Sequence, residues 1–407
     1  MKFFPLFVFV CCLLLALFGA TYCFSQGTWT QKAKFSGTGR TGAVGFSIGS
    51  KGYIGTGSDS LSNRKDFWEY DTITNAWTQK ANFGGTARYG AVGFSIGNKG
   101  FIGTGMDGIY RKDFWQWDQI TNTWSRKADF GGTVREGAVG FSIGGKGYIG
   151  TGADSVYFHY DFWEFDTTAN NWTQKAYYPG IGGGYGVGFS IGNKGFIGTG
   201  IDGLVDYAKD FWEYDPITNT WTQKADLNGP SPLYRGKCYA VGFSIGDKGY
   251  IGLGADTLNS QFQDFWEYDT TANTWTQKTN FGGLVRIRAV GFSIGAKGYI
   301  GTGYNIADCK DFWEFAPLAT DIKEIQDNIM VSVFPNPLTS SFTISINEEI
   351  QNGVLKIFNV QGNIVKNIPA QGKVFKIQNA DLETGIYFYS LISQEKIITQ
   401  GKIIVSK

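Results

Sequence analysis

A four-residue segment, Phe-Ser-Ile-Gly, occurs six times in this chain of 407 residues and sets the strongest limit on its fold. Two further landmarks recur in step with it: a Trp that ends Asp-Phe-Trp, and a Trp that usually precedes Thr-Gln-Lys. The three series are Phe46, Phe94, Phe141, Phe189, Phe243 and Phe292; Trp68, Trp115, Trp163, Trp212, Trp266 and Trp313; and Trp29, Trp77, Trp124, Trp172, Trp221 and Trp275. The period is about 48 residues, with one longer interval between the fourth and fifth copies. Such a period indicates a repeat architecture in which each copy packs against its neighbours.

Each copy is predicted to form four short β-strands, which we call a to d. In the second copy they cover residues 91–96, 100–104, 113–118 and 124–127, with turn segments at 97–99 and 120–122. The strands mix Val, Ile, Phe, Tyr and Trp with Gly and do not alternate cleanly, so both faces of each sheet must be covered. Four-stranded blades around a central axis meet this requirement, and we expect an all-β, six-bladed β-propeller over residues 26–317.

The two ends of the repeat array are incomplete in complementary ways. The first landmark, Trp29, belongs to a strand d that no strands a to c precede. The last landmark, Trp313, belongs to a strand c that no strand d follows. We therefore expect the N-terminal strand at residues 29–32 to complete the last blade, which would remove the exposed edges of an open array.

The repeat resembles the kelch family. The matching features are the Gly-rich second strand at residues 52–57, the Tyr70–Asp71 pair in the third strand, and Trp77 six residues after Asp71. Kelch repeats usually carry Gly-Gly at the end of the second strand, whereas this chain has Gly-Thr-Gly, which marks a divergent subfamily. The resemblance covers about residues 28–316 and implies the kelch type of propeller.

The N-terminal 25 residues have the features of a signal peptide. Lys2 precedes an apolar run at residues 3–20, and the small residues Cys23 and Ser25 favour cleavage between Ser25 and Gln26. An uncleaved membrane anchor is the alternative, because the run is close to spanning length. After cleavage we expect no stable transmembrane segment.

The C-terminal part has a different sequence pattern, without the repeat. A polar linker at residues 318–328 is followed by alternating strands and glycine turns over residues 329–407, which predict a small immunoglobulin-like β-sandwich. This part resembles the sorting domain of the type IX secretion system of Bacteroidetes-type bacteria. The motif residues are Pro335, Asn336, Pro337, Gly385, Tyr387, Lys402 and Lys407. The resemblance implies export in two steps, the type IX machinery as a partner, and a secreted or cell-surface protein. The alternative is a generic immunoglobulin-like adhesive module.

Composition excludes several classes of function. Lys and Arg number 36 against 35 for Asp and Glu, so the chain lacks the basic excess of a nucleic-acid-binding protein. Its single histidine rules out a galactose-oxidase type of copper site, which needs two, and we expect no metal or other cofactor. The two cysteines beyond the signal peptide, Cys238 and Cys309, could form a disulfide or remain free thiols.

In a propeller, the b–c and d–a loops share one face, and in this chain they vary more than the a–b and c–d turns. We therefore predict that this face binds a ligand, and three sets of residues on it are candidates. The first set, at the start of strand a, is cationic and could converge on an acidic ligand or pair locally with aspartates: Arg40, Arg88, Arg135, Lys237 and Arg286. The second could hold a cation or sugar hydroxyls, or simply shape its loops: Asp59, Asp107, Asp154, Asp202 and Asp256. The third is aromatic and could stack on sugars, anchor a protein or pack the loops: Tyr110, Tyr157, Phe158, His159, Tyr160, Tyr185, Tyr207 and Tyr304.

The sequence shows no catalytic group, so a non-catalytic recognition module for an extracellular glycan or protein is the leading hypothesis. The kelch resemblance keeps a second hypothesis open, since kelch-like propellers include a sialic acid mutarotase. Such a sugar mutarotase or epimerase would need only a few polar groups in the channel. A structural adhesion component is the third hypothesis.

Overall fold

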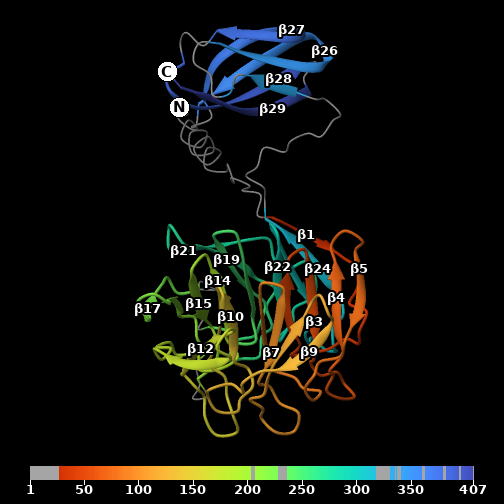
Figure 1. Ribbon diagram of the computed structural model, residues 1–407, viewed down its shortest axis with the longest axis vertical. Coiled ribbons are helices and arrows are strands. Elements are labelled where there is room, and N and C mark those ends of the chain that lie inside the picture. Colours follow the sequence, from red (N-terminus) through yellow and green to blue (C-terminus); the bar gives the residue numbers. More distant parts are fainter. Residues whose placement is uncertain are drawn as a thin grey trace, which may run out of the picture. The chain divides into compact units, whose positions relative to one another are not determined.

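The computed structural model describes residues 27–202, 207–227, 236–317, 331–334, 336, 341–359, 363–378, 382–393 and 396–406. The chain divides into two compact units, Met1–Leu318 and Ala319–Lys407, and the regular structure of the described residues consists of β-strands (Figure 1). The expected signal peptide with its Ser25–Gln26 cleavage site, and the expected linker, lie outside the described residues. Within the described ranges, no helix has the length and apolar character needed to cross a membrane.

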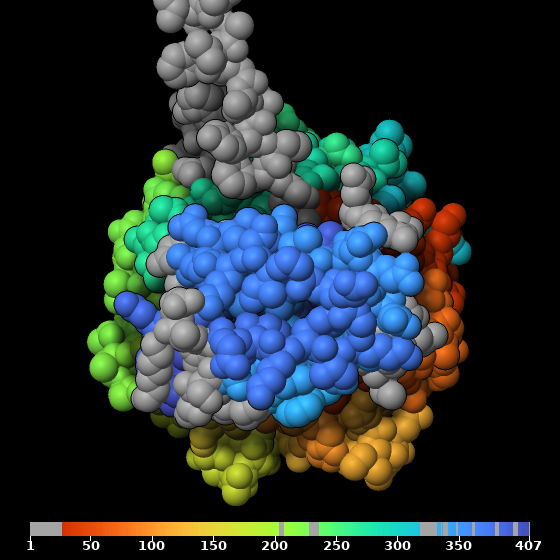
Figure 2. Space-filling model, turned by 90° about the horizontal axis from the view of Figure 1, so that it is seen from above, coloured from red at the N-terminus to blue at the C-terminus, as the bar shows by residue number. Residues whose placement is uncertain are grey.

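The first unit is a six-bladed propeller of four-stranded antiparallel sheets. Colours in Figure 2 run once around its rim, from red through yellow and green to cyan, so consecutive blades are neighbours. The blades are, in order, β2 (Val44–Ile48), β3 (Lys51–Gly55), β4 (Phe67–Asp71) and β5 (Ala76–Lys80); β6 (Val92–Ile96), β7 (Lys99–Gly103), β8 (Phe114–Asp118) and β9 (Thr123–Arg126); β10 (Val139–Ile143), β11 (Lys146–Gly150), β12 (Phe162–Asp166) and β13 (Asn171–Lys175); β14 (Val187–Ile191), β15 (Lys194–Gly198), β16 (Phe211–Asp215) and β17 (Thr220–Gln223); β18 (Val241–Ile245), β19 (Lys248–Gly252), β20 (Phe265–Asp269) and β21 (Thr274–Gln277); and β22 (Val290–Ile294), β23 (Lys297–Gly301), β24 (Phe312–Ala316) and β1 (Thr28–Gln31).

Aromatic rings and glycines together explain how neighbouring blades pack. The Phe46 ring of β2 lies against Gly100 of β7, where a Cβ would come within 2.5 Å of it. In the same interface Phe67 packs edge-on against Trp117 and Trp124 of the next blade, with ring centroids 5.0 and 5.3 Å apart. The repeated glycines therefore make room for the large rings, and these rings dominate the apolar area buried between blades.

The N-terminal strand completes the sixth blade. β1 pairs antiparallel with β24, which places Trp29 opposite Phe315 (Figure 1). The Trp29 indole Nε1–H donates to the Thr279 carbonyl over 3.1 Å, and the ring packs edge-on against Phe265 and Phe281. The first and last parts of the propeller are thus joined in one sheet, so the sixth blade has four strands like the other five and the ring of blades is closed.

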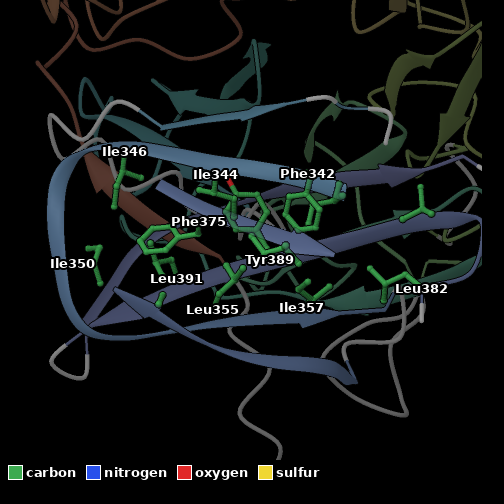
Figure 3. Close-up of a cluster of buried hydrophobic side chains, with 14 residues drawn as sticks. Phe342, Ile344, Ile346, Ile350, Leu355, Ile357, Phe375, Leu382, Tyr389 and Leu391 are labelled. Carbon is green, nitrogen blue, oxygen red and sulfur yellow. The ribbon is translucent and has the colours of Figure 1, made fainter. Parts of the chain in front are cut away.

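The second unit is a small β-sandwich of β25 (Val331–Phe334), β26 (Ser341–Phe358), β27 (Ile364–Gln378), β28 (Gly385–Ser393) and β29 (Lys396–Val405). Irregular register divides the long β26–β27 pairing into two stretches. One stretch continues into β25 and the other into β28 and β29, so the two strands contribute to both layers. Figure 3 shows the apolar core between the layers, with Phe342, Leu355 and Leu391 almost fully buried.

Candidate binding face and axial pocket

The b–c loops on the predicted ligand face are tied down by backbone pairing. In every blade, a residue at the start of strand a bridges to a residue after strand b, which bridges in turn to a residue further along the loop. Blade two shows the arrangement, with Tyr89 paired to Met106 and Met106 to Tyr110. This face is therefore a fixed platform that can hold side chains in defined positions.

The five cations of the first candidate set are buried, at 0 or 1% exposure, and each is paired with an aspartate at the start of strand c. Arg88 is typical: its guanidinium donates to both carboxylate oxygens of Asp113 over 2.6 and 2.9 Å and to the Thr104 carbonyl over 2.9 Å. Burial alone would raise the pKa of Asp113, but hydrogen bonds from Arg88 and Trp115 hold it below its ordinary value. Local pairing was the alternative that the sequence left open, and we assign Arg40, Arg88, Arg135, Lys237 and Arg286 to the scaffold rather than to a ligand.

Blade four departs from this pattern because Gly183 stands where the other blades have a cation. Its aspartate, Asp210, is 6% exposed and accepts hydrogen bonds on Oδ2 from Trp212 Nε1 (2.7 Å) and the Ile181 N–H (2.9 Å). Oδ1 is buried without a hydrogen-bond partner, and burial raises the pKa of this carboxyl. Tyr160 from the neighbouring blade occupies the vacated space, since a Cβ at Gly183 would lie 2.8 Å from its ring.

The aspartates of the second set shape their loops. Asp59, Asp107, Asp154 and Asp256 each accept, on Oδ1, the N–H of the residue two positions later. Three of these carboxylates also pair with a side chain of their own loop: Asp59 with Arg64, Asp107 with Arg111 and Asp154 with His159. Asp202 follows Ile201, which bridges to Gly184 and Tyr207. Among the described residues there is no group of three or more His, Cys, Asp or Glu side chains that could hold a metal ion.

The aromatic residues of the third set are split between several places. Tyr160 donates from its hydroxyl to the Ile181 carbonyl over 3.1 Å and so joins two loops. Tyr207 bridges to Ile201 through its backbone. Only Tyr185 lies at the central axis, where it meets residues that sequence reasoning did not select.

A closed ring of backbone hydrogen bonds surrounds this axis. In each blade the N–H of one residue just before strand a donates to the carbonyl of the equivalent residue in the preceding blade, over 2.8–3.1 Å. The six members are Gly42, Gly90, Gly137, Tyr185, Tyr239 and Arg288. All six have a left-handed backbone, with φ between 50° and 65°, which glycine adopts without cost.

Three members of the ring, Tyr185, Tyr239 and Arg288, adopt this conformation despite their bulky side chains, with φ of 56°, 54° and 54°. A left-handed non-glycine residue costs about 1–3 kcal/mol and tends to persist at functional sites. The glycines in the other half of the ring are required for a steric reason. A Cβ at Gly137 would lie 2.4 Å from the Tyr185 ring, and one at Gly90 would lie 2.5 Å from Glu136 Oε2. Large side chains thus converge on the axis from one half of the ring, and glycines leave room for them on the other half.

These side chains line an axial pocket of about 170 Å³. We define it by Glu136, Tyr185, Tyr239 and Arg288, together with the small residues of the glycine half. Arg288 lies over the Tyr239 ring at 4.3 Å and near the Tyr185 ring at 5.4 Å, and Tyr185 donates from its hydroxyl to Glu136 Oε1 over 3.1 Å. Glu136 Oε2 is buried without a hydrogen-bond partner; burial raises the pKa of Glu136, opposed by the nearby charge of Arg288 and the bond from Tyr185.

Sequence reasoning missed Glu136, Tyr239 and Arg288, although the sequence contains a signal for two of them. Tyr239 and Arg288 occupy positions that are glycine in the first three repeats, so they break the pattern in the part of the repeat nearest the axis. Glu136 carries no comparable signal, because its position varies in every repeat.

A second, larger hollow of about 680 Å³ lies between the loops of blades one and six, lined in part by Asp59, Leu61 and Tyr304.

The described sorting-motif residues lie in or against the last two strands. Gly385 begins β28, Lys402 lies in β29, and Tyr387 in β28 donates from its hydroxyl to the Glu383 carbonyl over 3.2 Å. Asn336 donates to the Lys402 carbonyl over 3.0 Å and accepts from the Ile404 N–H over 2.8 Å. Pro335, Pro337 and Lys407 lie outside the described residues.

In the first unit, Cys238 and Cys309 are free thiols rather than a disulfide.

Comparisons with known proteins agree with this organisation. Residues 332–406 match the family model of the secretion system C-terminal sorting domain. The propeller fold is that of a solved structure described as "Structure of YjhT", with a TM-score of 0.57, 17% sequence identity, and coverage of 69% of this chain and 95% of that one. No curated protein matches the sequence. The C-terminal unit is therefore a type IX sorting domain, and the chain carries a six-bladed propeller that is secreted or attached to the outer surface.

Proposed function

We propose that this exported propeller is a non-catalytic recognition module whose axial pocket and surrounding b–c and d–a loops bind an extracellular glycan or protein. The observation that carries the proposal is the left-handed backbone of Tyr185, Tyr239 and Arg288 in a ring where glycine serves the scaffold equally well. Backbone strain that the fold does not need is retained where the side chain has another use. Here the three side chains share one use, which is to form the wall of the axial pocket.

The chemistry of the pocket suits a small polar group with an apolar face. Arg288 offers hydrogen-bond donors and positive charge, while Glu136 Oε2 lacks a partner and can accept from a hydroxyl or amide. The rings of Tyr185 and Tyr239 provide flat surfaces of the kind that stack on sugar rings and apolar side chains. A cavity of about 170 Å³ admits a terminal sugar or a single side chain rather than a polymer.

The test is a glycan-array profile of the full chain and of two pocket variants, Tyr239→Gly and Arg288→Gly. Both variants place glycine at ring positions where the other half of the ring already has it, so the propeller should stay folded. We expect saturable binding to one glycan class, lost in both variants and kept in Arg126→Ala, which removes an exposed side chain on β9. Binding that persists in both pocket variants would place the site elsewhere. A blank array directs the search to a protein partner, identified by surface cross-linking with the same variants as controls.

One observation favours a second candidate, a sugar mutarotase. Glu136 is a buried carboxyl whose pKa is raised by burial, and it lies beside Arg288 and the Tyr185 hydroxyl, where a carboxyl can act as a proton donor or acceptor. The assay is anomer exchange of free sugars by the full chain, with Glu136→Gln as the comparison. A rate above background that Glu136→Gln abolishes would establish catalysis, and a rate equal to background in the native protein would end this candidate. The third hypothesis, a structural adhesion component, predicts self-association or attachment to surfaces instead of saturable binding in the pocket.

A further inference from the structure

The hollow of about 680 Å³ between the loops of blades one and six lies where the repeat lacks a large side chain. In each blade, the last residue of the loop bridges belongs to the junction with the start of strand a in the next blade. Phe158 shows the contact, because a Cβ at Gly184 of the next blade would lie 3.0 Å from its ring. In chain order the six pairs at these junctions are Asn63 and Tyr89, Tyr110 and Glu136, Phe158 and Gly184, Tyr207 and Cys238, Gln261 and Ile287, and Asp308 and Thr41.

Each of the first five pairs contains an aromatic ring or an isoleucine, whereas the sixth contains only Asp308 and Thr41. Both of these residues line the hollow. Two short polar side chains thus stand where the other junctions have a large one, and the space between the loops stays open. A departure from the repeat at this one junction is of the kind that serves a ligand rather than the scaffold.

Asp308 lines the hollow without a cation to balance its charge. Asp59, in the same hollow, pairs with Arg64, but no such ion pair forms at Asp308 among the residues that the structure describes. Burial and the charge of Asp59 raise the pKa of Asp308, and a hydrogen bond from the Ser60 N–H opposes them. The hollow therefore holds two carboxyl groups against one guanidinium, and a ligand that brings a cation would complete it.

Hydroxyl groups surround this carboxyl. Thr41 Oγ1 is buried, and within the described part of the chain it has no hydrogen-bond partner. Ser58 and Ser60 also line the hollow. Because a buried hydroxyl without a partner costs free energy, a ligand with hydroxyl groups of its own would be favoured here.

The remaining wall is apolar. Tyr304, which is 41% exposed, lines the hollow together with Leu61 and Ile306. A tyrosine ring offers a flat face that can stack on the apolar face of a sugar. The volume lies within the range of about 300–1,000 Å³ that is typical of small-molecule sites, so it admits a disaccharide.

We propose that this hollow binds an amino sugar with a free ammonium group, as in an oligosaccharide of glucosamine. Asp308 accepts hydrogen bonds from the ammonium, Thr41 and the two serines bond to sugar hydroxyls, and Tyr304 carries the apolar face of the ring. A neutral sugar would bury the Asp308 carboxylate further without a counter-charge. A lysine side chain would supply the charge, but its apolar stem has no partner for the hydroxyl groups.

The test is isothermal titration calorimetry of the full chain, at pH 7, with the β-linked disaccharides of glucosamine, N-acetylglucosamine and glucose. These probes share their ring and linkage and differ only in an ammonium, acetamide or hydroxyl group at the second carbon. We expect saturable binding of the glucosamine disaccharide, and binding about tenfold weaker or less for the other two.

Asp308→Asn keeps the shape of the side chain and removes its charge. It should weaken binding of the glucosamine disaccharide about tenfold or more and leave the melting temperature unchanged. Asp247→Asn is the matched control, because it removes the same charge from a side chain that is 74% exposed in an a–b turn, on the opposite face of the propeller. This control should bind the disaccharide like the native chain.

Three results would overturn the proposal. Equal affinity for the three disaccharides, or binding of none, would show that the hollow does not recognise an ammonium group. Binding that Asp308→Asn leaves unchanged would place the amino sugar elsewhere. The peptide glycyl-lysyl-glycine, if it binds as tightly as the glucosamine disaccharide and is lost in the same variant, would assign the hollow to a basic side chain of a protein partner. The axial pocket shares no lining residue with the hollow, so Arg288→Gly should bind the disaccharide like the native chain, and the two proposals fail separately.

Discussion

Asp210 lies where every other blade pairs an aspartate with a buried cation, but its own blade has Gly183 at the cation position. Burial raises the pKa of Asp210, so the folded chain binds this proton more readily than the unfolded chain does. Protonated Asp210 therefore contributes its full stability below the pKa of an aspartate in the unfolded chain, which is near 4. This contribution is lost as the pH rises from there through the raised pKa of Asp210 in the folded chain. We expect Asp210→Asn to raise the free energy of unfolding at pH 7 by about 1–3 kcal/mol, and to give no gain below pH 4, measured by urea denaturation.

Asp113→Asn is the matched control, because Asp113 has the cation that Asp210 lacks. The pKa of Asp113 is lowered in the folded chain, so its ionised carboxylate stabilises the fold at neutral pH. This stabilisation is lost as the pH falls through the lowered pKa. The substitution should destabilise the propeller at pH 7, where Asp210→Asn stabilises it. Equal effects of the two substitutions would contradict the assignment of Asp210 as an uncompensated buried carboxyl.

Arg88 tests the scaffold role of the buried cations. Arg88→Ala leaves Asp113 buried without its partner and should lower the free energy of unfolding by about 3–5 kcal/mol. Arg88→Lys should cost less, since Lys237 already pairs with both oxygens of Asp264 over 2.7 and 2.8 Å in the fifth blade. We expect the urea midpoint to be highest for the native chain, lower for Arg88→Lys and lowest for Arg88→Ala. An Ala variant as stable as the native chain would show that the pair is not structural.

The sequence predicts the architecture closely because one unit is written six times. Strands expected at residues 91–96 and 124–127 are observed at Val92–Ile96 and Thr123–Arg126. The incomplete ends of the array lead to the pairing that β1 and β24 make. The same packing between blades requires the same aromatic residues and glycines in every repeat, so their positions in the sequence predict where the strands lie.

The candidate site was less predictable because it depends on side-chain direction and backbone conformation. The spacing of Arg88 and Asp113 does not reveal whether the guanidinium faces the axis or its own blade. The positive φ of Tyr239 and Arg288 is likewise invisible until the ring of backbone bonds is seen. A search for departures from glycine at one repeat position would have found these two residues, but not Glu136.

The strain at the axis can be measured without knowing the ligand. Tyr239→Gly removes a left-handed non-glycine residue and also the contact of the Tyr239 ring with Arg288, two effects of opposite sign. Tyr239→Ala removes the same contact but keeps a Cβ in the left-handed conformation. We therefore expect the glycine variant to be more stable than the alanine variant by about 1 kcal/mol in urea denaturation. The reverse order would mean that this backbone is not strained, and would weaken the proposed function with it.

Asn336 provides the last prediction, because its side chain spans the end of the sorting domain. It donates to the Lys402 carbonyl and accepts from the Ile404 N–H, so one amide group fixes two points of β29. Asn336→Ala removes both bonds, whereas Asn336→Asp keeps the acceptor for Ile404 and loses the donor to Lys402. If the secretion machinery reads this strand in its folded position, the fraction of protein exported should fall in the order native, Asp, Ala. The melting temperature of the propeller should stay the same in all three, because Asn336 belongs to the other unit. Unchanged export of the Ala variant would show that the machinery does not depend on this clamp.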